Sequence, residues 1–330
     1  MTTLKIPADG AILSLQTETQ RQFIREAGQN AIQTRDGIDW LNLERSGEKD
    51  HSLPNPVTLT FETDEPHSTV EWSASADLTD ACRIETAERT VTLDCLTPGE
   101  TVYWRVNGSP IRSFRAKDEV PRFVGIDGLS NIRDSGGWKT SDGRRIRYGC
   151  IYRGGEMDRH QVITEKGIGQ MLHDWHIRTD LDIRGEAEGR TESPLGPSVR
   201  YLLCIPFVPY IKMFDPEGHD AMRRIFEAFA DETLYPIYYH CWGGADRTGT
   251  LAYLLEALLG VSEEDRLLDF ELTTLSIWGN RSRYMEEMVA FGEIFHALPG
   301  RDDPERAENF LLSCGVTPET IGRLRRNLLT

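Results

Sequence analysis

One segment combines a strand, a glycine-containing loop and a helix, and it constrains the fold more than any other part of the chain. Residues 235–240 (YPIYYH) are aromatic and β-branched, which is typical of a buried central strand. Residues 250–259 are apolar and stop at Gly260, which is typical of a buried helix with a glycine cap. The loop between them is 241–249 (CWGGADRTG). A buried strand that leads through a short loop into a buried helix is typical of α/β domains.

The chain after Pro121 repeats this alternation. We expect strands at 177–183 and 201–207, and helices over 164–175 with Thr164 as N-cap, over 219–230, after Ser262 and after Thr317. Strands that alternate with helices predict a central, mainly parallel sheet flanked by helices.

The N-terminal part has a different texture. Strand-like runs rich in Val, Thr, Trp and Tyr recur between polar turns, at 57–63, 68–75, 89–96 and 101–106. This spacing predicts a small all-β sandwich. Val70, Trp72, Val102 and Trp104 are expected in its core, although a carbohydrate-binding role for the aromatic residues stays open. Residues 10–18 fit an edge strand and 20–30 a short helix. We place the sandwich at 1–118 and the α/β domain at 119–330.

Composition limits the classes of function. Of 330 residues, 39% are hydrophobic, and no apolar run approaches the ~20 residues of a membrane span. The first residues lack the features of a signal peptide, so we expect a cytoplasmic protein, or a secreted one if a leader was removed. The net charge of −16 argues against nucleic acid as a partner. No CxxC pair suggests a zinc site, and the function inferred below is expected to need no metal and no cofactor. Whether Cys82 and Cys95 pair stays open.

The loop after residue 240 has the features of an anion site. A loop that enters a helix N-terminus gathers free N–H groups around one point, and a phosphate group suits them. Gly243, Gly244 and Gly249 allow the tight turn and a close approach of the backbone.

Cys241 and Arg247 lie at the two ends of this loop, separated by five residues. Positive potential there favours a thiolate over a thiol, and the guanidinium can bind two phosphate oxygens. Together they are suited to in-line displacement through a phospho-cysteine intermediate. In the alternative, structural interpretation, Cys241 is an ordinary buried thiol and Arg247 an ordinary surface charge. The coincidence of His240, the Cys–Arg spacing and the Thr-Gly that follows favours the functional one.

The segment HCWGGADRTG (240–249) resembles the HCxxGxxRTG signature of the protein tyrosine phosphatase superfamily. Three other segments resemble its bacterial branch of tyrosine and phosphoinositide phosphatases, namely 131–137, 152–155 and 180–186. That branch commonly carries lysine where this chain has Ala245. The N-terminal sandwich resembles, more weakly, a fibronectin type III module.

The resemblance implies a cysteine-dependent protein tyrosine phosphatase that hydrolyses phosphomonoesters, with phosphotyrosine as substrate. The alternatives are a phosphoinositide or inositol phosphatase and a catalytically silent phosphate-binding scaffold. The N-terminal module is a candidate for binding a further partner. The expected phosphate-binding residues are Trp242, Gly243, Gly244, Ala245, Asp246 and Arg247.

Three aspartates are candidates for the general acid, ranked Asp246, Asp182 and Asp215. Asp246 lies inside the loop, but could equally brace it. Asp182 lies at a predicted strand end, where a salt bridge with Arg184 is an alternative. Asp215 precedes a proline in a loop upstream, where an ordinary turn is the alternative.

The remaining candidates have supporting roles. Thr248 is expected to hydrogen-bond the departing thiolate, or to cap the helix. His240, Arg133 and Asp134 are expected to brace the site. Trp242 could line the rim or pack in the core.

Overall fold

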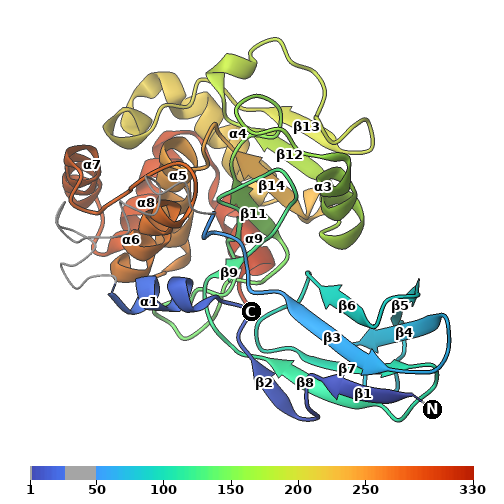
Figure 1. Ribbon diagram of the computed structural model, residues 1–330. Helices are drawn as coiled ribbons and strands as arrows, with labels where there is room; N and C mark the ends of the chain where they lie inside the picture. Colours follow the sequence, from blue (N-terminus) through green and yellow to red (C-terminus); the bar gives the residue numbers. More distant parts are fainter. Residues whose placement is uncertain (1, 27–49) are drawn as a thin grey trace. The chain divides into compact units, whose positions relative to one another are not determined.

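The computed structural model describes residues 2–26 and 50–330 (Figure 1). The chain divides into two compact units. One comprises the described residues of Met1–Thr17 and Pro54–Arg122, the other those of Glu18–Leu53 and Phe123–Thr330. Sequence analysis had placed 1–118 in a single module. In the structure, helix α1 (Glu18–Glu26) belongs instead to the second unit. The part of the predicted helix beyond residue 26 lies outside the described residues.

The described part of the first unit contains two sheets. The three-stranded sheet has the order β1 (Thr3–Ile6), β3 (Val57–Glu62), β6 (Thr90–Leu93). The five-stranded sheet has the order β2 (Ala11–Leu13), β8 (Arg112–Ala116), β7 (Thr101–Val106), β4 (Ser68–Ser73), β5 (Cys82–Thr86). All neighbouring strands are antiparallel except β2 and β8.

Alternation of buried and more exposed side chains along the strands explains how the core of this unit forms. In β3, Val57, Leu59 and Phe61 are buried while the residues between them are more exposed. The four strands predicted from alternation are confirmed, and so is the edge strand at 10–18. Strand β5 was missed because none of its side chains is buried, which leaves no alternation to detect. The resemblance to fibronectin type III modules stays a prediction.

Individual residues of this unit follow the expectation in most cases. Val70, Val102 and Trp104 are buried, whereas Trp72 is only partly buried against the same cluster. Cys82 and Cys95 are thiols and share no disulfide.

The second unit contains a six-stranded sheet. Its order is β13 (Arg200–Leu203), β12 (Thr179–Asp182), β14 (Ile237–His240), β11 (Ile151–Gly154), β10 (Arg133–Asp134), β9 (Arg122–Phe123). The first four strands are parallel and β10 is antiparallel to β11. Strand β14 is therefore central, as predicted, with Asp182 and Gly154 in register with His240 on its two sides. This register brings the carboxyl ends of three parallel strands to one edge, where α/β domains bind their ligands.

Helices surround this sheet. Their bounds are α3 (Glu165–Gly169), α4 (His219–Phe229), α5 (Asp246–Leu259), α6 (Glu263–Glu271), α7 (Glu286–Ala297), α8 (Asp303–Ser313) and α9 (Pro318–Leu328). Short helical turns η1 (Gln170–Asp174), η2 (Gly185–Ala187), η3 (Tyr210–Phe214), η4 (Pro216–Gly218), η5 (Glu232–Leu234) and η6 (Leu272–Leu275) complete the unit.

The predicted helix starts are confirmed. The hydroxyl of Thr164 accepts from the Gly167 N–H, and those of Ser262 and Thr317 cap α6 and α9 in the same way. Helix α5 packs against α6 and α8, so its N-terminus is held rigidly beside the end of β14.

Candidate active site

The loop 241–245 connects two fully anchored elements. All four residues of β14 are buried, and in α5 every residue from Thr248 to Leu259 is buried. Helix α5 ends at Gly260, which has φ +86°. Because both elements are fixed by packing, the short loop has little freedom, and its conformation is decided by its own contacts.

Carbonyl groups of the loop are held from outside it. Three consecutive carbonyl oxygens accept hydrogen bonds, that of Trp242 from the Glu156 N–H (2.8 Å), that of Gly243 from Asn131 Nδ2 (2.9 Å) and that of Gly244 from Arg153 Nη2 (3.0 Å). In a trans peptide the N–H points away from the preceding C=O. The N–H groups of Gly243, Gly244 and Ala245 therefore point away from the donors that bind the carbonyls. Together these three N–H groups form an anion cradle.

Two glycines permit this arrangement. Gly244 has φ +66°, and a Cβ there would lie 2.4 Å from the carbonyl carbon of Gly154. At Gly243, a Cβ would lie 2.9 Å from the ring of Trp278. Gly244 therefore has the positive φ of a tight turn, whereas Gly249, also predicted in the turn, lies inside helix α5. The close approach of the backbone to a ligand stays a prediction.

Cys241 and Arg247 lie at the two ends of the cradle. The Cys241 side chain is buried, with 3% of its surface exposed. Arg247 Nη1 donates to Glu186 Oε2 at 2.8 Å. Burial opposes the charged guanidinium, but the Glu186 hydrogen bond and the nearby Cys241 outweigh it, so the Arg247 pKa is raised. Arg247 is thus a permanent cation, and Glu186 engages only part of its donors.

His240 is the last residue of β14, directly before the loop in the sequence, and it is buried. Its Nε2 lies 2.8 Å from Asp180 Oδ1, and its Nδ1 lies 3.3 Å from the Cys241 carbonyl oxygen. Burial disfavours the charged imidazole, but Asp182 and Asp180 overcome this effect and raise the His240 pKa. The ring contacts the backbone at Cys241, which is consistent with the supporting role predicted for His240.

Arg133 and Asp134 brace different parts of the unit. Arg133 is fully buried and donates to Asn131 Oδ1 (2.6 Å) and Asp269 Oδ1 (3.0 Å), so it supports the loop through these neighbours. The Asp134 carboxylate accepts from the N–H groups of Gly136 and Gly149, both at 2.8 Å. Asp134 therefore stabilises a neighbouring turn.

Asp246 is held by two side chains from other segments. Its oxygens accept from Arg281 Nε (2.8 Å) and Nη2 (2.9 Å), and Tyr210 Oη makes a short hydrogen bond to Oδ1. Burial would favour the neutral acid, but the Arg281 hydrogen bonds and charge outweigh it and lower the Asp246 pKa. Asp246 is therefore a carboxylate at neutral pH.

Asp182 is buried in a salt bridge, the alternative weighed for it from sequence. Arg184 Nη2 lies 2.7 Å from Asp182 Oδ2, and Tyr201 Oη donates to the same oxygen at 3.0 Å. Burial raises the Asp182 pKa, but His240 and Arg184 lower it by more, so the Asp182 pKa is lowered overall. These contacts leave Asp182 less suited to release a proton.

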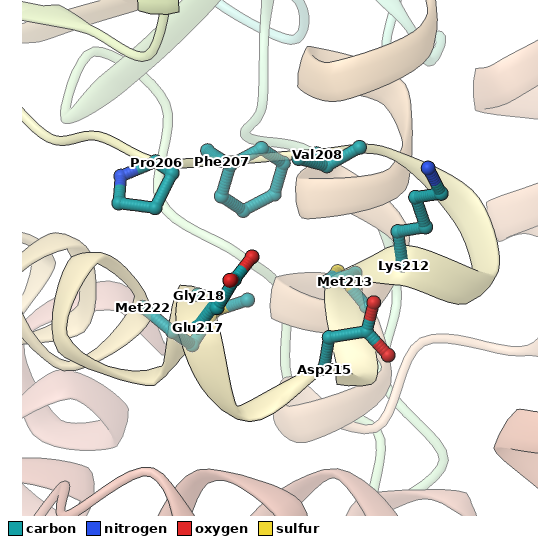
Figure 2. Close-up of a pocket in the computed structure, with 9 residues that line it drawn as sticks. All are labelled: Pro206, Phe207, Val208, Lys212, Met213, Asp215, Glu217, Gly218 and Met222. Carbon is teal, nitrogen blue, oxygen red and sulfur yellow. The ribbon is translucent and has the colours of Figure 1, made fainter.

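Asp215 lies in a separate pocket. Figure 2 shows it beside Lys212 at the edge of a cavity of about 140 Å³, which is also lined by Phe207, Met213 and Met222. Its backbone N–H bonds Lys212 O and its carbonyl accepts from Gly218, an ordinary turn. Within residues 2–26 and 50–330, no hydrogen bond or ion pair joins its carboxylate to the cysteine loop.

Thr248 and Trp242 complete the predicted set. Thr248 Oγ1 is buried and has no hydrogen-bond partner among the described residues, so it is available to an atom in the cradle. Trp242 is 39% exposed, which excludes core packing, and its ring lies 4.1 Å from that of His160. Trp242 therefore lies on the rim.

Sequence analysis missed several contributors: Tyr210, Arg281, Asp269, Trp278 and the side-chain role of Asn131. Tyr210, Arg281 and Trp278 come from segments with no motif, and only folding brings them to the loop. Asn131 stood within a recognised segment and carries φ +64°, a conformation that asparagine tolerates.

Two features are absent from the part of the chain that the structure describes. No helix there is long and apolar enough to span a bilayer. No group of three or more His, Cys, Asp or Glu side chains there is placed to hold a metal ion.

Comparison with known proteins identifies the family. Residues 124–330, more than half of the chain, match the sequence model described as the tyrosine phosphatase family. A Cupriavidus necator protein named "Putative tyrosine-protein phosphatase" is 27% identical over 171 residues, which cover 44% of this chain and 61% of that protein. The match thus spans less than two thirds of that relative.

Two solved structures are also similar. One is the core catalytic domain of the PP-IP phosphatase SIW14 from S. cerevisiae in complex with citrate, with 13% identity, a TM-score of 0.31, and coverage of 55% of this chain and 91% of that one. The other is P. aeruginosa TpbA, with 14% identity, a TM-score of 0.33, and coverage of 52% and 90%. On the match over residues 124–330, which contains the whole cysteine loop, this chain belongs to the tyrosine phosphatase family.

Proposed function

We propose that this protein is a cysteine-dependent phosphatase that hydrolyses phosphomonoesters, with phosphotyrosine as its substrate. The observation that carries the proposal is that donors outside the loop bind the carbonyls of Trp242, Gly243 and Gly244, which turns the N–H groups of these peptides away from those donors. Such a cradle suits the oxygens of a phosphoryl group and the charge that develops in its transition state.

The reaction has two steps. The Cys241 thiolate attacks phosphorus, an S–P bond forms, and the P–O bond to the leaving group breaks. Arg247 and the loop N–H groups hold the other phosphoryl oxygens. Water then attacks phosphorus and the S–P bond breaks. Inorganic phosphate is released and the Cys241 thiolate is regenerated. Thr248 Oγ1 is buried and has no hydrogen-bond partner among the described residues, so it is our candidate donor to that thiolate.

Asp246 is our candidate for carrying the proton in both steps. It would give a proton to the leaving oxygen and take one from the attacking water. Because Arg281 keeps the Asp246 pKa low, the protonated form needed for the first step is favoured at acidic pH. An acidic optimum is therefore part of the proposal. Asp182 ranks below Asp246 because its side chain is fully buried, whereas 37% of the Asp246 side chain is exposed and can meet a substrate. Asp215 ranks below both because it lines a separate pocket.

Phosphoinositides and inositol phosphates are the second substrate class, and two observations make it less favoured. Ala245 stands where related loops carry lysine. Arg281 is neutralised by Asp246, and its Nη1 donates to the carbonyls of Trp278 and Asn280. Hydrolysis of a phosphoinositide panel in preference to phosphotyrosine peptides would support this class.

The test is hydrolysis of para-nitrophenyl phosphate in the presence of EDTA and dithiothreitol. The wild type should be active and Cys241→Ser inactive. Cys204→Ser is the matched control, because burial raises the pKa of the Cys204 thiol to about 11 and makes it unreactive. Activity that survives in Cys241→Ser would contradict the mechanism. A folded, reduced wild type without activity on any substrate would indicate a phosphate-binding scaffold.

A further inference from the structure

We infer that Asp269, on helix α6, is a positioning residue that holds the phosphate loop in shape through two buried arginines. The inference rests on the proposed function, because it concerns the geometry of the same cradle. Asp269 is buried and belongs to no motif.

Asp269 accepts hydrogen bonds from two arginine side chains. Its Oδ1 accepts from Arg133 Nε at 3.0 Å, and its backbone carbonyl accepts from Arg133 Nη2 at 2.9 Å. Its Oδ2 makes a short hydrogen bond with Arg153 Nη1. Arg133 and Arg153 are both almost completely buried, so neither can exchange this partner for water. One carboxylate therefore orients two guanidinium groups.

Each arginine continues to a different carbonyl of the loop. Arg153 Nη2 donates directly to Gly244 O at 3.0 Å. Arg133 Nη1 donates to Asn131 Oδ1 at 2.6 Å, and Asn131 Nδ2 donates to Gly243 O at 2.9 Å. Two consecutive peptide groups are thereby turned outward by one carboxylate. The opposite faces of these peptides supply the N–H groups of the cradle.

The charge of this cluster suits an anion site. Two guanidinium groups face one Asp269 carboxylate. The nearby Glu256 is also buried, and neither of its carboxylate oxygens has a hydrogen-bond partner within the described residues. Burial and the Asp269 charge raise the Glu256 pKa well above its ordinary range, in spite of Arg153, Arg266 and Arg133. Glu256 is therefore neutral and leaves the cluster with excess positive charge beneath the loop.

The experiment compares Asp269→Asn with Asp303→Asn. Both replacements keep the shape of the side chain and remove a carboxylate that is paired with arginine. Asp303 pairs with Arg266 and Arg306, which do not contact the loop in the structure. We measure kcat and KM for para-nitrophenyl phosphate, the affinity for sodium tungstate by calorimetry, and Tm.

Asp269→Asn should lower kcat about 10- to 100-fold and weaken tungstate binding, less than the ~10²- to 10³-fold loss caused by removing a transition-state donor outright. Asp303→Asn should lower Tm while kcat and tungstate affinity stay as in wild type. Equal kcat and tungstate losses in the two variants, or none in Asp269→Asn, would overturn the inference.

A second variant covers the case in which Asp269→Asn does not fold. Asn131→Gly removes one relay side chain, and glycine accepts the positive φ of this position. It should weaken tungstate binding with a folded chain, and wild-type affinity would count against the inference. The tungstate measurement does not require turnover. If the wild type were inactive, the proposed function would fail while the positioning role of Asp269 would still be decided.

Discussion

Arg281 holds both oxygens of Asp246, with Nε at 2.8 Å from Oδ1 and Nη2 at 2.9 Å from Oδ2. These residues are 35 positions apart in the chain, and Asp246 is the first residue of helix α5. The pair places the Arg281 guanidinium beside Asp246 and keeps the carboxylate ionised. It therefore controls the protonation of the residue that we propose as proton carrier.

Replacing Arg281 by Gln should change the pH dependence of catalysis. Arg281 lowers the Asp246 pKa, so its loss should raise that pKa and keep Asp246 protonated to higher pH. The descending limb of kcat/KM should then move to higher pH. A pH profile with para-nitrophenyl phosphate tests this, with Arg301→Gln as a control at an exposed ion pair. An unmoved limb in Arg281→Gln would exclude Asp246 as the acid.

Replacing Arg247 by Lys should lower kcat/KM strongly. Lysine keeps the charge but loses the planar fork that binds two phosphate oxygens. We expect a loss on the order of 10²- to 10³-fold, comparable to the loss of a transition-state donor. Steady-state kinetics measure it. A loss below about 3-fold would mean that only charge matters at this position.

Glu186 should act through Arg247. It accepts from Arg247 Nη1 at 2.8 Å and thereby orients the guanidinium. Glu186→Ala should lower kcat/KM by roughly 10-fold, since misplaced groups lose much of their effect. Glu186→Gln keeps an acceptor and should retain most of the activity. If the Gln variant lost as much as the Ala variant, the charge of Glu186 rather than its hydrogen bond would be responsible.

Gly244→Ala should abolish the cradle. Its φ is +66°, and an alanine Cβ would lie 2.4 Å from the carbonyl carbon of Gly154 and 2.5 Å from its oxygen. We expect a loss of kcat/KM of about 10²-fold or more, because the loop must shift. Gly292→Ala is the control: Gly292 lies in helix α7 with open space around its Cβ position, so Ala should stabilise the helix by about 1 kcal/mol. Wild-type kinetics in Gly244→Ala would contradict the loop geometry.

His240 should make stability depend on pH. Its pKa is raised in the folded protein, so the folded state binds the proton more tightly than the unfolded chain. The stabilisation is complete below about pH 6.5 and is lost as the pH rises through the raised pKa. Urea unfolding at several pH values measures this. Asp180→Asn removes the partner of Nε2 and should flatten the dependence above pH 6.5 relative to wild type.

Much of the fold follows from local patterns that the sequence displays. The strand 237–240 and residues 250–259 of helix α5 follow from their apolar and aromatic composition, and the caps at Thr164, Ser262 and Thr317 from local hydrogen bonding. Helix α5 begins earlier than predicted, at Asp246. Such features depend on neighbours in the chain, so a single sequence reveals them. Strand β5 escaped because its side chains are not buried, and the grouping of α1 with the second unit has no local signal.

For the site, the sequence by itself was enough to predict Cys241 as nucleophile and Arg247 as phosphate clamp, because their spacing within one segment is a local property. The tertiary structure alone decided which groups tune them. Asp269, Arg281 and Tyr210 reach the loop from helices and turns far along the chain, and their roles depend on burial and on the direction of single hydrogen bonds. Those quantities arise only when packing removes water and brings distant charges within a few ångströms of each other.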